Sequence, residues 1–93
     1  MSLNPDNARV LDELALLLAR SGRSLEALSL AKQSVELAPW DAHALATLSA
    51  VYGLLGNCRD ALEFYKRARR LSLQSAPEQL VEVEGQCLKP PAP

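Results

Sequence analysis

Aromatic residues are scarce in this 93-residue chain, since Phe, Trp and Tyr together make up only 4% of it. Apolar residues nevertheless reach 48%, and most of them are Leu, Ala and Val. A core of this composition is built from many small contacts rather than from a few large rings. It suits helices that pack closely, with Ala at the points where they cross.

An excess of charge of one sign is also missing, because ten Lys and Arg residues balance eleven Asp and Glu residues to give a net charge of −1. This balance offers no bulk electrostatic argument for binding nucleic acid or an anionic membrane. The sequence contains no apolar run of about 18 residues, so no transmembrane helix is predicted. No signal peptide is visible at the start of the chain, which favours a cytoplasmic location.

Cys and His are too few and too scattered to predict a metal site. Cys58 and Cys87 form no CxxC pair, and we expect two free thiols rather than a disulfide, because a helical domain of this size needs no covalent staple. His43 is the only histidine and has no catalytic partner nearby in the sequence. Neither a G-x-S-x-G turn nor a Gly-rich phosphate loop is present. We therefore predict no enzymatic activity and no cofactor.

The most informative feature is an internal repeat with a period of about 34 residues. Small, large and turn-forming residues all recur in register: Ala8 with Ala42, Leu11 with Leu45, Leu14 with Leu48, Gly22 with Gly56, and Ala27 with Ala61. A period of this length is typical of stacked helical units that bury their apolar faces against their neighbours.

Apolar spacing of three and four residues predicts five helices and no strand. The first begins near Asp6 and the second spans 24–37, where Pro39 ends it. The third and fourth are expected at 41–55 and 59–71, and a shorter fifth at 77–88, after a connector at 72–76.

The pattern within each period resembles the tetratricopeptide repeat, a helix–turn–helix unit of about 34 residues whose first helix reads W-x-x-L-G-x-x-Y. The second unit has Leu45, Leu48, Ser49 and Tyr52 at these places, and the first has Leu11, Leu14, Ala15 and Leu18. The turn glycine, the second-helix alanine and the closing proline match Gly22, Gly56, Ala27, Ala61 and Pro39. Two departures are Ala31, where the family has an aromatic residue, and Leu73, where it has the closing proline.

The resemblance implies an all-α fold, a right-handed α-α superhelix (solenoid) of two helix–turn–helix units and a C-terminal capping helix. The units are expected at 8–41 and 42–75, the capping helix at 76–88 and a Pro-rich tail at 89–93. Pro5 lies one repeat period before Pro39, so residues 1–7 are interpreted as the end of an earlier repeat in a longer array. A natural start with Pro before a helix is the alternative.

The resemblance also implies protein–protein interaction, because the first helix of each unit in this family lines a concave groove that holds a partner's peptide or helix. The corresponding positions are Arg9, Asp12, Leu16, Ala19, Arg20, His43, Ala46, Thr47, Ala50, Gly53 and Leu54. They predict a mildly apolar floor with charges at its rim, which suits a helix or an apolar extended segment. A solvated face without a partner is the alternative.

The groove positions and the charge pattern also bear on two other binding modes, the capture of a chaperone carboxylate and the binding of RNA or an acidic partner. One subgroup of the family grips the C-terminal carboxylate of chaperones with Lys and Asn, but the matching positions hold Asp12, Leu16 and Thr47, so we predict no such binding. The basic run 66–70 is interpreted as a solvated helix end rather than as a site for RNA or an acidic partner.

Trp40 is expected to cover the seam between the units. An exposed Trp40 would instead be a contact point.

Self-association is a competing function. Val10, Leu16 and Leu17 make the first helix apolar nearly all round, and the unit expected to cover Val10 and Leu17 is missing from this sequence. Because burying a Leu side chain is worth about 1.5–3 kcal/mol, such a face is expected to form homo-oligomers. A third alternative is a regulatory domain of a larger enzyme.

Overall fold

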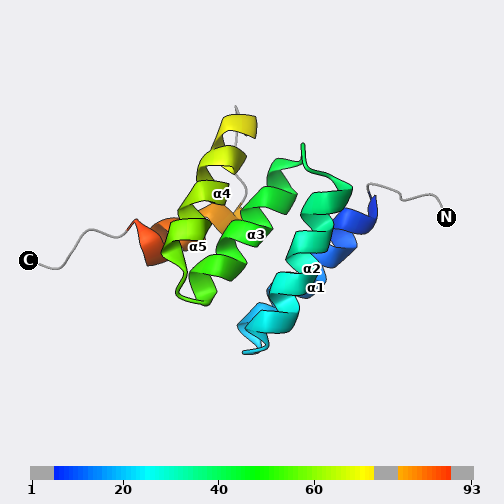
Figure 1. The fold of residues 1–93 in the computed structure, drawn as a ribbon, viewed down its shortest axis with the longest axis horizontal. Helices are drawn as coiled ribbons and strands as arrows, with labels where there is room; N and C mark the ends of the chain where they lie inside the picture. The colour runs from blue at the N-terminus through cyan, green and yellow to red at the C-terminus, as the bar shows by residue number, and fades with distance from the viewer. Residues whose placement is uncertain (1–5, 73–77, 89–93) are drawn as a thin grey trace, which may run out of the picture.

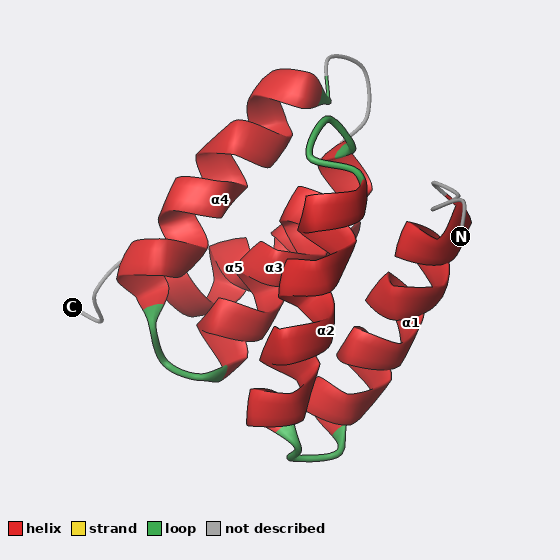
Figure 2. Cartoon of the chain, turned by 45° about the vertical axis from the view of Figure 1, so that its right-hand side comes forward, coloured by secondary structure: helices red, strands yellow, loops and turns green. Residues whose placement is uncertain are grey.

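Five helices make up the computed structural model, which describes residues 6–72 and 78–88 (Figure 1). They are α1 (Asp6–Arg20), α2 (Ser24–Leu37), α3 (Ala42–Leu54), α4 (Cys58–Leu71) and α5 (Glu78–Cys87). The two described ranges contain no strand (Figure 2), so the all-α prediction is confirmed. The predictions for residues 1–5, for most of the connector and for the tail at 89–93 lie outside the described residues.

The helices form two hairpins and a fifth helix that returns to the second hairpin. α1 packs along α2, and α3 packs along α4. α3 also contacts α1 and α2, so it joins the two hairpins, while α5 contacts α3 and α4 (Figure 2). α3 is therefore the central helix, with the other four packed against it.

The turns of the two hairpins are built alike. Each contains a glycine in the left-handed region, Gly22 at φ 86° and Gly56 at φ 82°, where residues with a side chain are strained. In each turn the residue after the glycine donates its amide N–H to the carbonyl five residues earlier, at 2.8 Å in the first turn and 2.9 Å in the second. This is the Schellman arrangement that closes a helix end. The same backbone geometry thus recurs once in each repeat unit.

Alanines make up most of the core. Of the sixteen apolar residues that the structure describes as buried, eleven are alanines. A side chain this small lets two helix axes approach closely, and larger residues fill the space on either side. The alanines with no exposed surface are Ala8, Ala15, Ala27, Ala31, Ala44, Ala46, Ala61 and Ala68.

One buried serine in each hairpin forms a hydrogen bond between its two helices. The Ser34 hydroxyl on α2 donates to the Ala8 carbonyl on α1 at 3.1 Å, and the Ser49 hydroxyl on α3 donates to the Ala61 carbonyl on α4 at 2.6 Å. Because both hydroxyl groups are bonded, burying them carries no large desolvation cost. Ser49 therefore takes the small-residue position of its unit without leaving a buried polar group unpaired.

Cys58 and Cys87 form a disulfide, so the prediction of two free thiols is wrong. Cys58 is the first residue of α4 and Cys87 the last of α5, and their Cα atoms lie 5.4 Å apart. The return of α5 across the second hairpin brings them together. The disulfide thereby ties α5 to the helix that it packs against.

Trp40 lies on the connection between α2 and α3 and is 64% exposed. The prediction that it covers the seam between the hairpins is therefore wrong. Ala27 and Ala31 of α2 pack in one cluster with Leu48 and Val51 of α3, so the two helices meet without the indole ring. An exposed indole of this size is a candidate contact point for another protein.

Replacing Gly22 or Gly56 with Ala should lower the free energy of unfolding by about 1–2 kcal/mol each, because a side chain is disfavoured in the left-handed region. Space does not decide the outcome, since a Cβ at either position meets no atom within 4 Å. Gly85→Ala is the matched control, because Gly85 is helical and equally open, and it should raise stability by about 0.5–1 kcal/mol. Urea denaturation followed by circular dichroism measures all three; an unchanged Gly56→Ala chain contradicts the role of the turn.

Removing the disulfide with Cys58→Ser and Cys87→Ser together should lower the free energy of unfolding by about 2–4 kcal/mol, because the unfolded chain regains the freedom of the closed loop. That loop joins residues 29 positions apart. Denaturant melts of the two chains measure the difference. Thiol titration of the unreduced, denatured native chain should find no free thiol, and two free thiols would contradict the assignment.

Candidate functional site

The predicted groove residues lie on α1 and α3, but six of the eleven are buried. Arg9, Arg20 and Leu54 are exposed, and Leu16 and His43 are half-buried. The buried ones are Asp12 and Ala19 on α1 and Ala46, Thr47, Ala50 and Gly53 on α3. We call the last four residues the α3 floor. Burial of the α3 floor was not expected for a surface that receives a partner.

α5 covers the α3 floor, and its two apolar anchors fill it. Leu80 packs in a cluster with Ala46, and Val83 packs in a cluster with Ala50. Both anchors have no exposed surface. The floor consists of small residues, so a helix can lie close to α3 and bury a Leu and a Val completely.

The polar residue and the glycine of the α3 floor also contact α5. The Gln79 Nε2 donates to the Thr47 Oγ1 at 3.3 Å. A Cβ on Gly53 would lie 2.6 Å from the Gln86 Oε1, so a larger residue there would push the Gln86 side chain away. Every residue of the α3 floor therefore meets α5.

A chain of hydrogen bonds links α1, α3 and α5 at one end of this contact. The His43 Nδ1 lies 2.7 Å from the Asp12 Oδ2, and the Gln79 Nε2 lies 3.0 Å from the His43 Nε2. With Gln79 donating, the imidazole carries its proton on Nδ1 and donates it to Asp12. The other oxygen of Asp12 is buried without a hydrogen-bond partner among the described residues, so the carboxylate depends on His43.

His43 looks isolated in the sequence, because Asp12 lies 31 positions before it. The packing of α3 against α1 brings the two together. The side chain of Asp41 caps α3 and accepts from the His43 amide at 3.0 Å, which fixes the start of the helix and the position of the imidazole. Asp12 aligns with position 46 of the second unit, about one helical turn after His43. This offset was the signal in the sequence that could have indicated the pair.

Two further polar contacts fix α5 at its exposed edges. The Arg20 Nη2 donates to the Glu82 Oε1 at 2.6 Å, which joins α5 to α1. The Tyr65 hydroxyl on α4 donates to the Glu84 Oε2 at 2.5 Å. This hydrogen bond, together with burial and the charge of Glu84, raises the pKa of the Tyr65 hydroxyl above its ordinary value. Both contacts pair a carboxylate of α5 with a donor of the hairpins.

The outer face of α1 carries the residues predicted to self-associate. Val10 is 64% exposed and Leu17 is 62% exposed. Leu14 lies between them at helical spacing and is also exposed. The three form an apolar stripe at positions i, i+4 and i+7 of the helix, which lie on one face.

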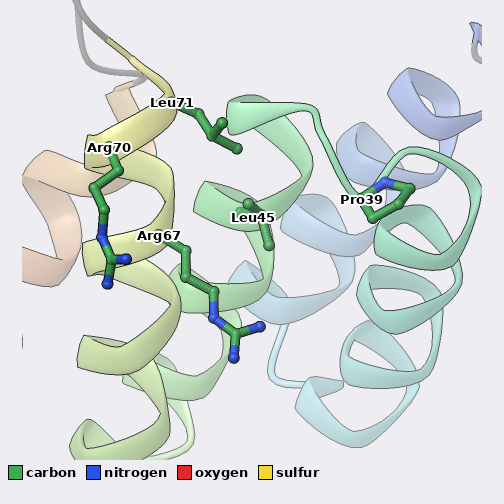
Figure 3. Close-up of a pocket in the computed structure, with 5 residues that line it drawn as sticks. All are labelled: Pro39, Leu45, Arg67, Arg70 and Leu71. Carbon is green, nitrogen blue, oxygen red and sulfur yellow. The ribbon is translucent and has the colours of Figure 1, made fainter.

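The basic run at the end of α4 borders a separate pocket of about 280 Å³. The pocket lies between α4 and the connection from α2 to α3 and is lined by Pro39, Leu45, Arg67, Arg70 and Leu71 (Figure 3). The Arg67 guanidinium lies over the Phe64 ring, and its Nη2 is 3.1 Å from the Glu63 Oε1. The Arg69 guanidinium lies over the ring of Tyr65, whose hydroxyl is bonded to Glu84 of α5.

Neither a metal-binding cluster nor a membrane-spanning helix is found in the described part of the chain. Residues 6–72 and 78–88 contain no group of three His, Cys, Asp or Glu side chains that could hold a metal ion. None of the helices found there is long and apolar enough to cross a membrane.

The model of one known protein family matches this chain. Its description is tetratricopeptide repeat, and it matches residues 8–74, more than two thirds of the chain. No curated protein and no solved structure matches. Repeats of this family mediate protein–protein interaction, and their fold is not a catalytic one.

The match agrees with the two hairpins, the recurring turn geometry and the alanine positions of the core. It covers α1 to α4 and ends before α5. The sequence resemblance is thus confirmed: the chain belongs to the tetratricopeptide repeat family, as an all-α helical repeat solenoid with a C-terminal helix.

Proposed function

We propose that the chain is a protein–protein interaction module that binds a helix of a partner protein across the α3 floor. One observation carries this proposal: α5, a helix of the chain itself, already lies there. A surface that accepts Leu80 and Val83 with no exposed remainder has the shape and the polarity that an amphipathic helix requires. A partner helix would take the place of α5.

α5 is the shortest of the described helices and the weakest on its own, although the disulfide ties its last residue to α4. It has ten residues, whereas isolated helices shorter than about 12–15 residues are marginal in water. Gly85 lies within it and costs about 1 kcal/mol relative to Ala. Its Val81 is 66% exposed, so one of its larger apolar side chains contributes little to the packing. These features favour exchange with a helix that makes the same contacts better.

The experiment opens the α3 floor and supplies a helix from outside. Leu80→Glu places a charge in the apolar cluster and should release α5 from the α3 floor. A labelled peptide of residues 78–88 with Cys87→Ser should then bind this chain one to one, at least about tenfold more tightly than it binds the control chain, where the tethered α5 competes at high effective concentration. Fluorescence anisotropy measures the affinity.

Val81→Glu is the matched control, because Val81 lies on the exposed side of α5. Circular dichroism checks that both chains keep their helices. If Leu80→Glu loses its helicity, the chain with Cys58→Ser and Cys87→Ser replaces it, since α5 is then held without a covalent bond. Absence of peptide binding to a folded, opened chain contradicts the proposal.

A second candidate function, self-association, is favoured by the apolar stripe of Val10, Leu14 and Leu17. Their exposed fractions of 64%, 43% and 62% leave a continuous apolar surface on α1. Surfaces of this kind on soluble proteins commonly mark an interface. An isologous contact between two copies of α1 would cover the stripe on both.

The native chain should sediment as a dimer at micromolar concentration, and Leu17→Glu should give a monomer, because a charge in the contact is left unpaired on burial. Val81→Glu again serves as the control, since Val81 lies on the exposed side of α5 and is not part of the α1 stripe. It should leave the dimer intact. Sedimentation velocity separates the two states, and a monomeric native chain contradicts self-association.

The remaining hypotheses from the sequence stay predictions. We expect no catalytic activity in this chain. We also expect no binding of a chaperone carboxylate, because Asp12 matches a position where the family's clamp requires a cation. No observation among the described residues favours a regulatory domain of a larger enzyme over a general interaction module.

A further inference from the structure

The hairpins offer donors, and not carboxylates, to the helix on the α3 floor. Arg20 meets Glu82 at 2.6 Å, and Tyr65 meets Glu84 at 2.5 Å. The carboxylate of Asp12 on α1 is fully buried and already paired with His43 at 2.7 Å. A carboxylate on the bound helix therefore finds a cation and a hydroxyl, and meets no exposed like charge from these contacts.

The amide of Gln79 sets the register of the helix. Its Nε2 lies within reach of both the His43 Nε2, at 3.0 Å, and the Thr47 Oγ1, at 3.3 Å. Gln79 is buried, so a residue without a donor at this place would leave two acceptors unpaired. A shift of the helix by one residue would move the amide away from both acceptors and the apolar anchors out of the α3 floor.

We propose that the α3 floor selects an acidic amphipathic helix with the pattern of residues 79–84, namely Gln, an apolar residue, any residue, Glu, an apolar residue and Glu. This inference rests on the proposed function and adds the chemistry of the partner. The apolar positions supply burial, the amide fixes the register, and the first Glu meets Arg20. Selection is local, because the whole chain carries a net charge of −1 and does not attract acidic partners in general.

The occupant is a helix of a partner protein and not α5 of a second copy. Exchange of α5 between two copies would give each copy the contacts that it already has. A separate helix can gain from better helix propensity at the positions of Gly85 and Val81, which α5 does not use.

A charge exchange between Arg20 and position 82 tests the selection. The receptor is the Leu80→Glu chain, whose own α5 can occupy neither its own α3 floor nor that of a second copy. The probe is the peptide 78–88 with Cys87→Ser, either otherwise native or with Glu82→Arg. The receptor carries Arg20 or Arg20→Glu, and Arg20 is exposed enough for the change to spare the fold.

On the receptor with Arg20, the Glu82→Arg peptide should bind about tenfold more weakly, because an exposed attraction worth up to about fivefold is replaced by a repulsion. On the Arg20→Glu receptor the Glu82→Arg peptide should instead bind more tightly than the native peptide. A peptide with Val81→Arg is the matched control, since position 81 faces away from the α3 floor, and it should bind like the native peptide to both receptors.

Equal binding of the native and Glu82→Arg peptides to both receptors overturns the inference and leaves the proposed function standing. Failure of every peptide to bind a folded receptor overturns both. If the Leu80→Glu receptors lose their helicity, the same four combinations are measured on the chain with Cys58→Ser and Cys87→Ser at excess peptide. If that chain, with Leu17→Glu added to remove the α1 contact, is still a dimer without peptide, a second copy is the occupant and the choice of a partner helix is contradicted.

Discussion

The close approach of helices through alanine is the constraint on which the structure depends. Eleven of the sixteen buried apolar residues that the structure describes are alanines, so stability comes from short distances between helix axes rather than from large side chains. This packing leaves little tolerance, because one added methylene at a crossing point separates two backbones. Ser34 and Ser49 satisfy the same requirement, since each is small and spends its hydroxyl on a carbonyl of the facing helix.

The same small residues explain why α3 can receive a helix. Ala46, Ala50 and Gly53 present almost no side chain to α5, so Leu80 and Val83 supply the apolar volume of the contact. A floor of this kind fits many apolar anchors and discriminates poorly among them. Discrimination then falls to the edges, where Arg20, Tyr65 and Gln79 make directional contacts. The shape of the α3 floor therefore allows a helix to bind, and the polar contacts at its edge determine which helix is selected.

Period and spacing predicted the hairpins well and the site poorly. The helix at 24–37 and the two turn glycines lie where the sequence placed them, because those features arise within one repeat unit. α5 lies outside the period, and nothing in the spacing of its residues indicates that it returns across α3. The Cys58–Cys87 disulfide, the burial of the α3 floor and the contact of Glu82 with Arg20 all follow from that return. The pair of Asp12 and His43 was equally hidden, since it depends on how one hairpin packs on the next.

Occupation of the α3 floor by α5 changes what a partner must achieve. A helix tethered by a short connector competes at an effective concentration of about a millimolar, so a free helix with the same contacts displaces little of it. The disulfide strengthens this competition, because α5 is then fixed at both of its ends. The apparent affinity for any partner is the intrinsic affinity multiplied by the fraction of chains that are open. Weak apolar helices are therefore excluded by competition alone, and only a helix that improves on α5 at the polar edge or in its own stability can bind.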